Sequence, residues 1–354
     1  MVKSVKKKAV ALISGGLDST LSALLIKQQG IEVIGLHFSH AFNASIESYL
    51  SCEKSGQKID LTAANDRYIN ELKSVMNQVG IRLHIEQITE KIIKLLKNPR
   101  YGFGRNLNPC VDCRIMQFKF AKSYMEKIGA DFLVTGEVVG QRPMSQLKNT
   151  IKLIEKQAGL EELIVRPLSA KLLPETIPEK NGWISRENLY GISGRGRKMQ
   201  KELAKKLGIV EYPESAGGCR LTYEGFARKM KDLVDHKEPD MNDAYLLQIG
   251  RHFRTSKYGK AIVGKNAKEN EMLKKLSREG DILIEVFDGK GPTVLLRDKN
   301  SDIDLILAAC LCVSHADIDK QPYKPVRYWE HGSNRMSVRQ VAPLEKEQIE
   351  KMRI

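Results

Sequence analysis

The sequence lacks any hydrophobic run of the roughly 20 residues that a membrane-spanning helix needs. Its longest apolar stretch covers residues 305–313, which is too short to cross a bilayer and predicts a buried element instead. Near the N-terminus, lysines precede an apolar stretch that is shorter than the core of a signal peptide and runs into Gly15 and Gly16. We therefore expect a cytoplasmic protein that does not contact a membrane.

Cysteines are few, six in 354 residues, and repeats and low-complexity tracts are absent. Structural disulfides are rare in the cytoplasm, so a cluster of cysteines would indicate metal or redox chemistry. We expect Cys310 and Cys312, which lie in an apolar run, to be core residues, and we assign no role to Cys52. Hydrophobic residues make up 42% of the chain and charged residues 29%, which excludes bulk disorder. At about 150 residues per domain, the length predicts two domains.

Positive charge, in contrast, is abundant. The formal net charge of +15 favours an anionic partner, nucleic acid first. Most of the excess lies in residues 1–240, where two basic patches stand out. The first patch comprises Lys91, Lys94, Lys97, Arg100, Arg105, Arg114, Lys119 and Lys122, and the second comprises Arg195, Arg197, Lys198, Lys201, Lys205 and Lys206. Either patch is equally consistent with a solvated helix face.

Strands and helices alternate in the first half of the chain. Short apolar runs predict strands at 9–13, 31–38, 81–85, 131–135 and 163–168, and helical spacing follows Gly16 and recurs at 61–79, 113–128 and 145–157. The alternation predicts an α/β fold whose parallel sheet is covered on both faces and binds ligands at the carboxyl ends of its strands. Residues 172–236 have a helical and basic pattern. Beyond residue 241, short strands between glycine-rich turns predict a second, smaller α+β domain.

The segment SGGLDS, residues 14–19, lies between the first predicted strand and the first helix. Its glycines allow a tight turn, so that free N–H groups can converge on an oxyanion such as pyrophosphate. Ser14 and Ser19 add hydroxyl donors, and Asp18 fits beside phosphate if it contacts Mg²⁺ or orients the loop. The segment resembles the SGGxDS signature of the PP-loop ATP pyrophosphatases, which implies ATP and Mg²⁺ as cofactors. Sulfurtransferases and nitrogen-transferring ligases share this signature.

Cys110 and Cys113 form a CxxC pair at the start of a predicted helix, and Cys219 lies far downstream in a flexible, cationic stretch. A CxxC pair brings two sulfurs within reach of one metal or of each other. The helix N-terminus and Arg114 are expected to lower the thiol pKa values and favour thiolates. Three cysteines would hold a 4Fe-4S cluster with one iron open for sulfide. Alternatively, Cys219 would carry a persulfide that a CxxC cysteine resolves.

Further motifs follow the fourth and fifth predicted strands. Residues 135–149 read TGEVVGQRPMSQLKN, and residues 166–168 read RPL. Together with the loop, His37, Phe38 and Cys219, these motifs resemble those of the tRNA 4-thiouridine synthase (ThiI-type) family over roughly residues 8–225. The resemblance implies a HUP/PP-loop (adenine nucleotide alpha hydrolase-like) domain with a parallel sheet, and the ATP-dependent thiolation of a tRNA uridine.

The resemblance also implies roles for individual residues. Cys219 would be the catalytic cysteine that handles activated sulfur, with Asp18 at the PP-loop, and Arg114 would contact an ATP phosphate or the ribose. Cys110 and Cys113 fall where members without a rhodanese module carry an added CxxC pair, so these two and Cys219 would be the ligands of a 4Fe-4S cluster. The implied nucleotide-binding residues are Leu12, Ile13, Ser14, Gly15, Gly16, Asp18, Ser19, His37, Phe38, Arg114, Gly136 and Gln146.

The sequence departs from that family at several points. Thr20 follows the PP-loop signature where family members carry proline, and one residue is inserted between Gln141 and Ser145. We find neither the tRNA-binding THUMP region before the loop nor a rhodanese module after it. We therefore expect another part of the chain to contribute to tRNA binding.

Residues 250–254, 263–270 and 291–293 resemble parts of the RNA-binding NFACT-R domain. Basic and aromatic side chains in this region are expected to form a surface for phosphates and stacked bases. They are Arg251, Phe253, Arg254, Lys257, Tyr258 and Lys260. We expect His252 and His315 to be structural rather than ligands.

Four segments result: a PP-loop ATP-binding and sulfurtransferase domain at 1–175, a basic helical extension carrying Cys219 at 176–238, an NFACT-R-like domain at 239–330 and a polar tail at 331–354. The expected activity is tRNA thiolation, with sulfur from sulfide or a cysteine desulfurase persulfide, at C2 or C4 of the base. Two alternatives stay open: a nitrogen-transferring PP-loop ligase acting on a small molecule, and a non-catalytic RNA-binding protein.

Overall fold

The computed structural model describes residues 6–43, 66–209, 218–317 and 322–354, so that Cys52 lies outside the described residues. The chain divides into two compact units, with residues up to 44 and 65–222 in the first and residues 223–354 in the second. Within the described ranges, no helix is both long and apolar enough to cross a membrane.

The first unit is built on a parallel sheet of five strands in the order β3-β2-β1-β4-β5. The strands are β1 (Lys8–Leu12), β2 (Glu32–Ser39), β3 (Arg82–Gln87), β4 (Phe132–Thr135) and β5 (Ile164–Val165). The chain builds outward from β1 in one direction and then crosses to the other side, so the carboxyl ends of β1 and β4 are neighbours at the switch point of the sheet. The predicted parallel α/β fold is confirmed.

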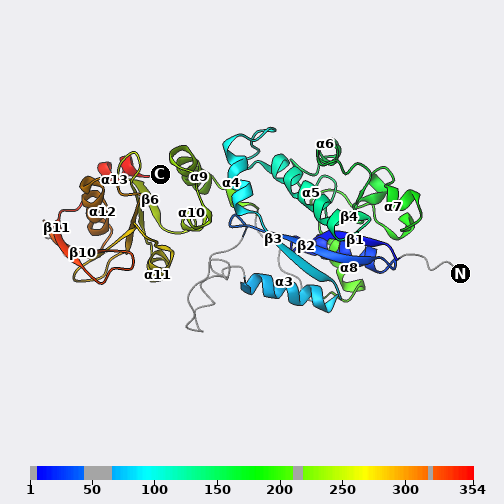
Figure 1. Cartoon of the computed structure of the whole chain (residues 1–354), viewed down its shortest axis with the longest axis horizontal. Coiled ribbons are helices and arrows are strands. Elements are labelled where there is room, and N and C mark those ends of the chain that lie inside the picture. Colours follow the sequence, from blue (N-terminus) through cyan, green and yellow to red (C-terminus); the bar gives the residue numbers. More distant parts are fainter. Residues whose placement is uncertain (1–5, 44–65, 210–217, 318–321) are drawn as a thin grey trace. The chain divides into compact units, whose positions relative to one another are not determined.

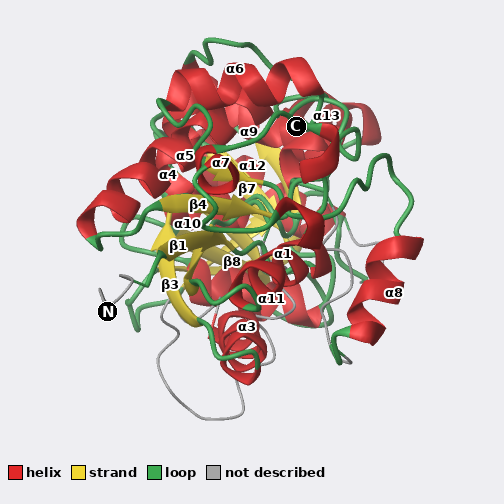
Figure 2. Cartoon of the chain, turned by 90° about the vertical axis from the view of Figure 1, so that its right-hand side faces the viewer, coloured by secondary structure: helices red, strands yellow, loops and turns green. Residues whose placement is uncertain are grey.

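Helices cover both faces of this sheet (Figure 1, Figure 2). In β1, Ala9 and Ala11 pack toward α1 and α3, and Val10 and Leu12 pack toward α5 and α6, as the two-residue period of a strand requires. The helices are α1 (Leu17–Lys27), α3 (Asp66–Gln78), α4 (Thr89–Lys97), α5 (Cys110–Lys127), α6 (Lys148–Ala158), α7 (Ile177–Lys180) and α8 (Lys198–Lys206). The sequence did not lead us to expect α4, and residues 172–209 are less helical than their pattern suggested.

The second unit has an antiparallel sheet of six strands in the order β11-β10-β8-β9-β7-β6. The strands are β6 (Arg251–Arg254), β7 (Lys260–Val263), β8 (Ile282–Val286), β9 (Val294–Arg297), β10 (Lys324–Glu330) and β11 (Ser337–Val341). Its helices are α9 (Glu224–His236), α10 (Met241–Leu246), α11 (Ala267–Leu276), α12 (Asp302–Ser314) and α13 (Lys346–Met352). The apolar α12 packs on one sheet face and buries Cys310 and Cys312, which confirms them as core residues.

The segment from 331 onward, expected to be a polar tail, takes part in this sheet. Val338 of β11 pairs with Arg327 of β10. Farther along, Arg353 forms a bridge with Phe253, and the Ile354 N–H donates to the His252 carbonyl. The polar composition of the segment reflects an edge strand and a surface helix rather than a free end. The expected domain limits themselves stay predictions.

Candidate active site

The loop between β1 and α1 is the centre of the candidate site. Gly15 has a φ of 83°, a left-handed conformation that favours glycine. The Ser19 hydroxyl donates to the Gly16 carbonyl at 2.8 Å and lies 3.2 Å from the Ser14 hydroxyl, which fixes the turn. No side chain caps the first turn of α1, so its N–H groups remain available to an anion.

The end of β4 lies directly against this loop. A Cβ atom added to Gly136 would come within 2.4 Å of the Ser19 backbone nitrogen, so only glycine fits at this position. The structure therefore brings Gly136 and the SGGLDS loop together, as the sequence predicted for one nucleotide pocket. The contact depends on the direct pairing of β1 with β4.

Asp18 is held at the start of α1 with an exposed fraction of only 8%. Its Oδ2 accepts a hydrogen bond from Gln141 Nε2 at 2.9 Å, and Arg197 Nη2 lies 3.7 Å from the same oxygen. Its Oδ1 is buried and has no hydrogen-bond partner among the described residues. A buried carboxylate oxygen without a donor is a strong ligand for a hard cation such as Mg²⁺.

His37 and Phe38 end β2 beside the loop. His37 Nδ1 lies 2.8 Å from the Ile13 carbonyl, and burial lowers the pKa of His37, so the ring is neutral at pH 7. Phe38 meets Phe120 edge to face, with ring centroids 5.7 Å apart. Leu12 and Ile13 are buried next to them. Leu12 and Phe38 pack on one face of the sheet and Ile13 on the other, so these residues surround the strand ends beside the SGGLDS loop rather than form a single surface.

Glu137 is a buried carboxylate shared by two arginines. Its Oε1 accepts from Arg114 Nε at 2.7 Å, and its Oε2 accepts from Arg166 Nε at 3.0 Å. Although burial opposes ionisation, the two guanidinium groups hold the pKa of Glu137 below its ordinary value. Arg114 also donates to Gln117 Oε1 at 2.9 Å, and the Gln117 amide faces Cys113 Sγ at 3.5 Å. Arg114, expected at the nucleotide, is therefore tied to the end of β4 and to the CxxC helix.

Two backbone hydrogen bonds, one to the segment after β2 and one to the segment before α5, fix the residues that follow Cys219. The N–H of Arg220 donates to the Phe42 carbonyl after β2 at 3.0 Å, and Leu107, just before α5, donates to the Leu221 carbonyl at 3.2 Å. Cys110 and Cys113 begin α5. Residues more than 100 positions apart in the sequence thus meet in one unit.

Burial and neighbouring thiols oppose the ionisation of Cys113 and Cys219. Burial raises the pKa of Cys113 to about 12, and repulsion from Cys219 and Cys110 adds to the rise. Burial likewise raises the pKa of Cys219 to about 11, with a contribution from Cys110. The Arg114 charge does favour the Cys113 thiolate, but the expected net lowering of the Cys113 pKa is wrong, because desolvation and the neighbouring thiols outweigh the guanidinium charge.

Cys110, Cys113 and Cys219 were expected to be the ligands of a 4Fe-4S cluster. Among the described residues, no three His, Cys, Asp or Glu side chains are arranged to hold one metal ion. A four-iron cluster spaces its cysteines around a larger body, and its positive irons would overcome the desolvation that opposes thiolate formation. The cluster assigned to these three cysteines therefore stays a prediction.

The loop at residues 140–146 contacts the SGGLDS loop and places a positive charge near Cys219. Gln141 contacts Asp18, and the charge of the next residue, Arg142, acts on Cys219 and favours its thiolate. Gln146 is 7% exposed and shapes this loop by accepting a hydrogen bond from the Arg142 N–H at 3.1 Å. The sequence predicted Gln146 but not Gln141, Glu137 or Arg197, whose contacts depend on tertiary packing.

In the second unit, the proposed basic and aromatic surface is partly wrong. Phe253 is fully buried under α12, and Lys260 is 4% exposed on the other face of the sheet. Arg254 Nη2 pairs with Asp232 at 2.8 Å. Tyr258, in contrast, is 47% exposed, and Lys257 Nζ lies 5.2 Å from the centre of its ring. Both faces of β6 and β7 are covered, so alternate residues do not point to solvent.

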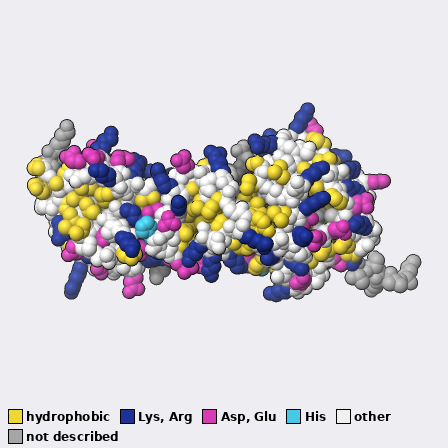
Figure 3. All heavy atoms as spheres, turned by 90° about the horizontal axis from the view of Figure 1, so that it is seen from above, with side chains coloured by type: hydrophobic (Ala, Val, Ile, Leu, Met, Phe, Trp, Pro, Cys, Tyr) yellow, Lys and Arg dark blue, Asp and Glu magenta, His cyan; other side chains and the backbone are white. Residues whose placement is uncertain are grey.

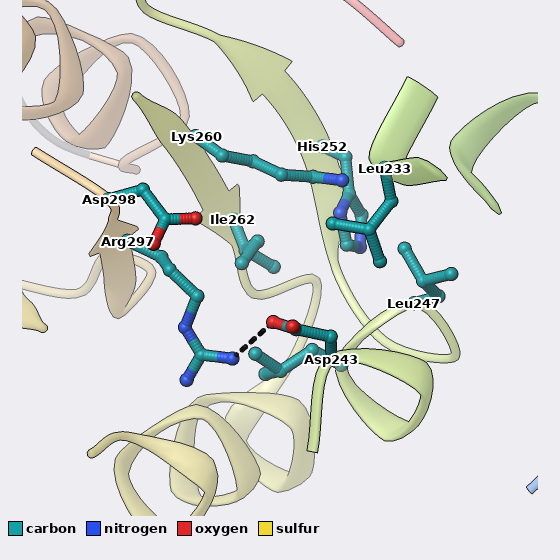
Figure 4. A pocket seen from close by; sticks show the side chains of 9 residues that line it. Leu233, Asp243, Leu247, His252, Lys260, Ile262, Arg297 and Asp298 are labelled. Atoms are coloured by element: carbon teal, nitrogen blue, oxygen red, sulfur yellow. Dashed lines mark hydrogen bonds and ion pairs between the residues drawn. The ribbon is translucent and has the colours of Figure 1, made fainter. Parts of the chain in front are cut away.

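A small pocket lies on the face of the sheet that carries Lys260 (Figure 4). Lys260 extends toward His252, whose Nε2 lies 2.8 Å from the Ile249 carbonyl, and burial lowers the pKa of Lys260 to about 8. Arg297 Nη1 pairs with Asp243 at 2.9 Å across the floor. Lys260 pairs with Asp232 and Asp298 with Lys237, so the charges around the pocket have partners, while the structural role expected of His252 stays a prediction. On the face of the molecule that Figure 3 shows, Lys and Arg side chains are interspersed with acidic ones.

Two family profiles match the chain. Residues 4–172 match the family described as "Thiamine biosynthesis protein (ThiI)". Residues 250–353 match the family described as "NFACT protein RNA binding domain". The second match includes β11 and α13, in agreement with the sheet pairing.

Curated relatives include proteins described as "tRNA-specific 2-thiouridylase MnmA". The one from Geobacter metallireducens is 30% identical over 141 residues, which cover 38% of this chain and 36% of the relative. The one from Francisella tularensis subsp. novicida is 24% identical over 257 residues, which cover 70% of this chain and 63% of the relative. The chain thus spans between about a third and two thirds of the length of these relatives.

Solved structures with some likeness include a 4-thiouridine synthetase–RNA complex with bound ATP. It is 18% identical, with a TM-score of 0.37, over 68% of this chain and 52% of that one. The C-terminal part of the fibronectin/fibrinogen-binding protein from Streptococcus suis is 14% identical, with a TM-score of 0.28, over 87% of this chain and 98% of that one.

Proposed function

We propose that this chain, which combines a ThiI-type PP-loop domain with an NFACT-type RNA-binding domain, is an ATP-dependent tRNA sulfurtransferase. One observation carries the proposal. The loop at 140–146 contacts the nucleotide loop through Gln141 and acts on Cys219 through Arg142, so an activated substrate at the loop would be near the sulfur chemistry.

The nucleotide-binding half of the site would work through the backbone. N–H groups of residues 14–19 and the Ser14 and Ser19 hydroxyls would hold the pyrophosphate end of ATP. The adenine would be faced by Leu12, Ile13, His37 and Phe38. The His37 ring is neutral, so it would not repel a nearby cation. Gly136 and Gln146 would complete the pocket, and Arg114, fixed by Glu137, would approach a phosphate or the ribose.

Mg²⁺ would be held by the free Oδ1 of Asp18 and by ATP oxygens. When bound, the ion would neutralise charge on the departing pyrophosphate. Gln141 would hold the Asp18 carboxylate in position, and the loop N–H groups would hold the phosphates of ATP. Because Asp18 is buried, removing its charge should affect this step far more than it affects adenine binding.

The reaction has two steps. The carbonyl oxygen of a tRNA uridine attacks the α-phosphate of ATP, the bond between the α- and β-phosphates breaks, and pyrophosphate leaves. A sulfur nucleophile then attacks the activated carbon, and the carbon–oxygen bond breaks to release AMP. Neither oxidation nor reduction of the base is involved. The oxygen of the base leaves with AMP, and sulfur takes its place.

Cys110, Cys113 and Cys219 would supply the sulfur in one of two ways. As ligands of a 4Fe-4S cluster, they would leave one iron open to bind sulfide. Without a cluster, Cys219 would carry a persulfide taken from a cysteine desulfurase, and the outer sulfur would attack the activated carbon. A CxxC thiol would then attack the Cys219 sulfur, which releases the thiolated base and leaves a disulfide that an external thiol reduces. We favour the cluster, because the chain brings three cysteines, Cys110, Cys113 and Cys219, into one unit.

Iron analysis distinguishes the two routes. Protein purified without oxygen should be brown and contain iron, and Cys110→Ser, Cys113→Ser and Cys219→Ser should each reduce the iron content. Colourless, iron-free protein that thiolates tRNA with a persulfide donor would contradict the cluster route and support the persulfide.

Release of pyrophosphate tests the proposed function more broadly. It should need Mg²⁺ and increase when tRNA is added, whereas ammonia or glutamine should have no effect. A response to ammonia or glutamine would indicate a nitrogen-transferring ligase instead. Absence of turnover together with retained RNA binding would indicate a non-catalytic RNA-binding protein.

A further inference from the structure

Residues 190–194 lead to Arg197, a basic residue that lies near the SGGLDS loop. The N–H groups of Tyr190 and Ile192 donate to the carbonyls of Pro167 and Leu168, which follow β5. Farther along, the Gly194 N–H donates to the Val139 carbonyl at 2.8 Å. The segment therefore runs beside the carboxyl ends of β4 and β5, where the candidate site lies.

The helix that follows is fixed by apolar packing. Leu203 and Ala204 of α8 share a buried cluster with Leu17, Leu21 and Leu25 of α1. Since α1 begins at the nucleotide loop, this packing sets the distance between the start of α8 and the loop. Arg197 immediately precedes α8 and is positioned by both anchors.

Arg197 lies near Asp18 but does not form a hydrogen bond with it. The 3.7 Å between Arg197 Nη2 and Asp18 Oδ2 is too long for a hydrogen bond, and the arginine side chain is 32% exposed. Gln141 already occupies the same oxygen at 2.9 Å. Among the described residues, Arg197 has no other carboxylate partner. The guanidinium can turn toward an anion in the loop without breaking a good bond.

We propose that Arg197 is a catalytic residue that contacts the β- and γ-phosphates of ATP and the pyrophosphate that leaves. This inference rests on the proposed nucleotide site and assigns a role to a residue outside its motifs. A guanidinium can donate two parallel hydrogen bonds to phosphate oxygens, and its charge offsets the negative charge that develops on the leaving group. AMP lacks those phosphates and would not be contacted.

Binding measurements on the full chain test this role. Isothermal titration calorimetry with Mg²⁺ would compare ATP, pyrophosphate and AMP for wild type, Arg197→Gln and Arg197→Lys. A charge-assisted hydrogen bond contributes enough that Arg197→Gln should weaken ATP and pyrophosphate binding about tenfold or more, with AMP unchanged. Arg197→Lys should recover part of the loss, because it restores charge but not the planar fork.

Arg82→Gln is the matched control. Arg82 also lies 3.7 Å from a carboxylate, that of Glu32, but it begins β3 at the opposite edge of the sheet, and its side chain is 85% exposed. The Arg82→Gln variant should bind ATP, pyrophosphate and AMP as tightly as wild type does.

Unchanged pyrophosphate binding in Arg197→Gln would overturn the proposal, as would an equal loss for AMP, which would indicate a disturbed fold. Wild-type protein that binds neither ATP nor pyrophosphate would instead overturn the proposed nucleotide site itself.

Discussion

Replacing Glu137 by glutamine should destabilise the first unit strongly. The carboxylate joins Arg166, whose side chain is 2% exposed, to Arg114, whose side chain is 20% exposed. Removing one member of a buried ion pair leaves an uncompensated charge, and such changes cost about 3–5 kcal/mol. Glutamine keeps the shape and one acceptor, and Arg166 keeps Glu155 as a partner. We therefore expect a loss of about 3 kcal/mol in the free energy of unfolding.

The chain offers a separate fluorescent reporter for each unit. Of its two tryptophans, Trp183 lies in the first unit beside Phe132, and Trp329 lies in β10 of the second. In a Trp329→Phe background, urea unfolding followed by fluorescence would report the first unit alone. With a slope of about 2 kcal/mol per molar urea, the midpoint should fall by about 1.5 M. Glu126→Gln, an exposed glutamate on α5, should leave the midpoint unchanged.

The pH dependence gives a second check with a defined sign. The pKa of Glu137 is lower in the folded unit than in the unfolded chain, so its stabilisation is present above the unfolded pKa and is lost as pH falls through the folded one. The difference in urea midpoint between wild type and Glu137→Gln should therefore become smaller as the pH falls from 7 toward 3. A midpoint equal to that of Glu126→Gln, or a gap that pH does not change, would refute this view of Glu137.

Four further changes test other parts of the site and fold. Asp18→Asn should reduce Mg²⁺-dependent pyrophosphate release at least tenfold while calorimetry still detects AMP binding, because only the cation ligand is lost. Cys219→Ser should abolish thiolated nucleosides in digests of tRNA but leave ATP binding intact, and loss of ATP binding would contradict that division of labour. Gly136→Ala should lower the thermal midpoint of the first unit, since its Cβ would lie 2.4 Å from a backbone nitrogen, whereas an added Cβ at Gly196, in the same unit, meets nothing within 4 Å, so Gly196→Ala is the control. Lys260 has a folded pKa of about 8, below its unfolded value, so the second unit should gain stability from about pH 8 to 10. Lys260→Met, followed by Trp329 fluorescence, should lack that slope.

The sequence was most informative where a local pattern determines the contact. The β1–loop–α1 unit could be predicted because glycines, a preceding apolar run and a following helix are all local signals. The meeting of Cys219 with Cys110 and Cys113 was expected from a family resemblance. The backbone anchors at Phe42 and Leu107 that produce it have no sequence signature.

Other features depend on burial, which the sequence does not reveal. Arg114 was expected to favour the Cys113 thiolate, but desolvation of the thiol is the larger effect. Phe253 and Lys260 look like a binding surface in sequence, yet helices cover both faces of their sheet. Arg197 belonged to a basic patch of unknown use until the packing of α8 on α1 brought it near Asp18.

The most direct test of the central claim is mass spectrometry of nucleosides from tRNA incubated with the purified protein, Mg²⁺, ATP and sulfide under anaerobic conditions. The account predicts one thiolated uridine per modified site, formed only with ATP and accompanied by equal amounts of AMP and pyrophosphate. AMP and pyrophosphate formed without any thiolated nucleoside, with either sulfide or a persulfide donor, would contradict it.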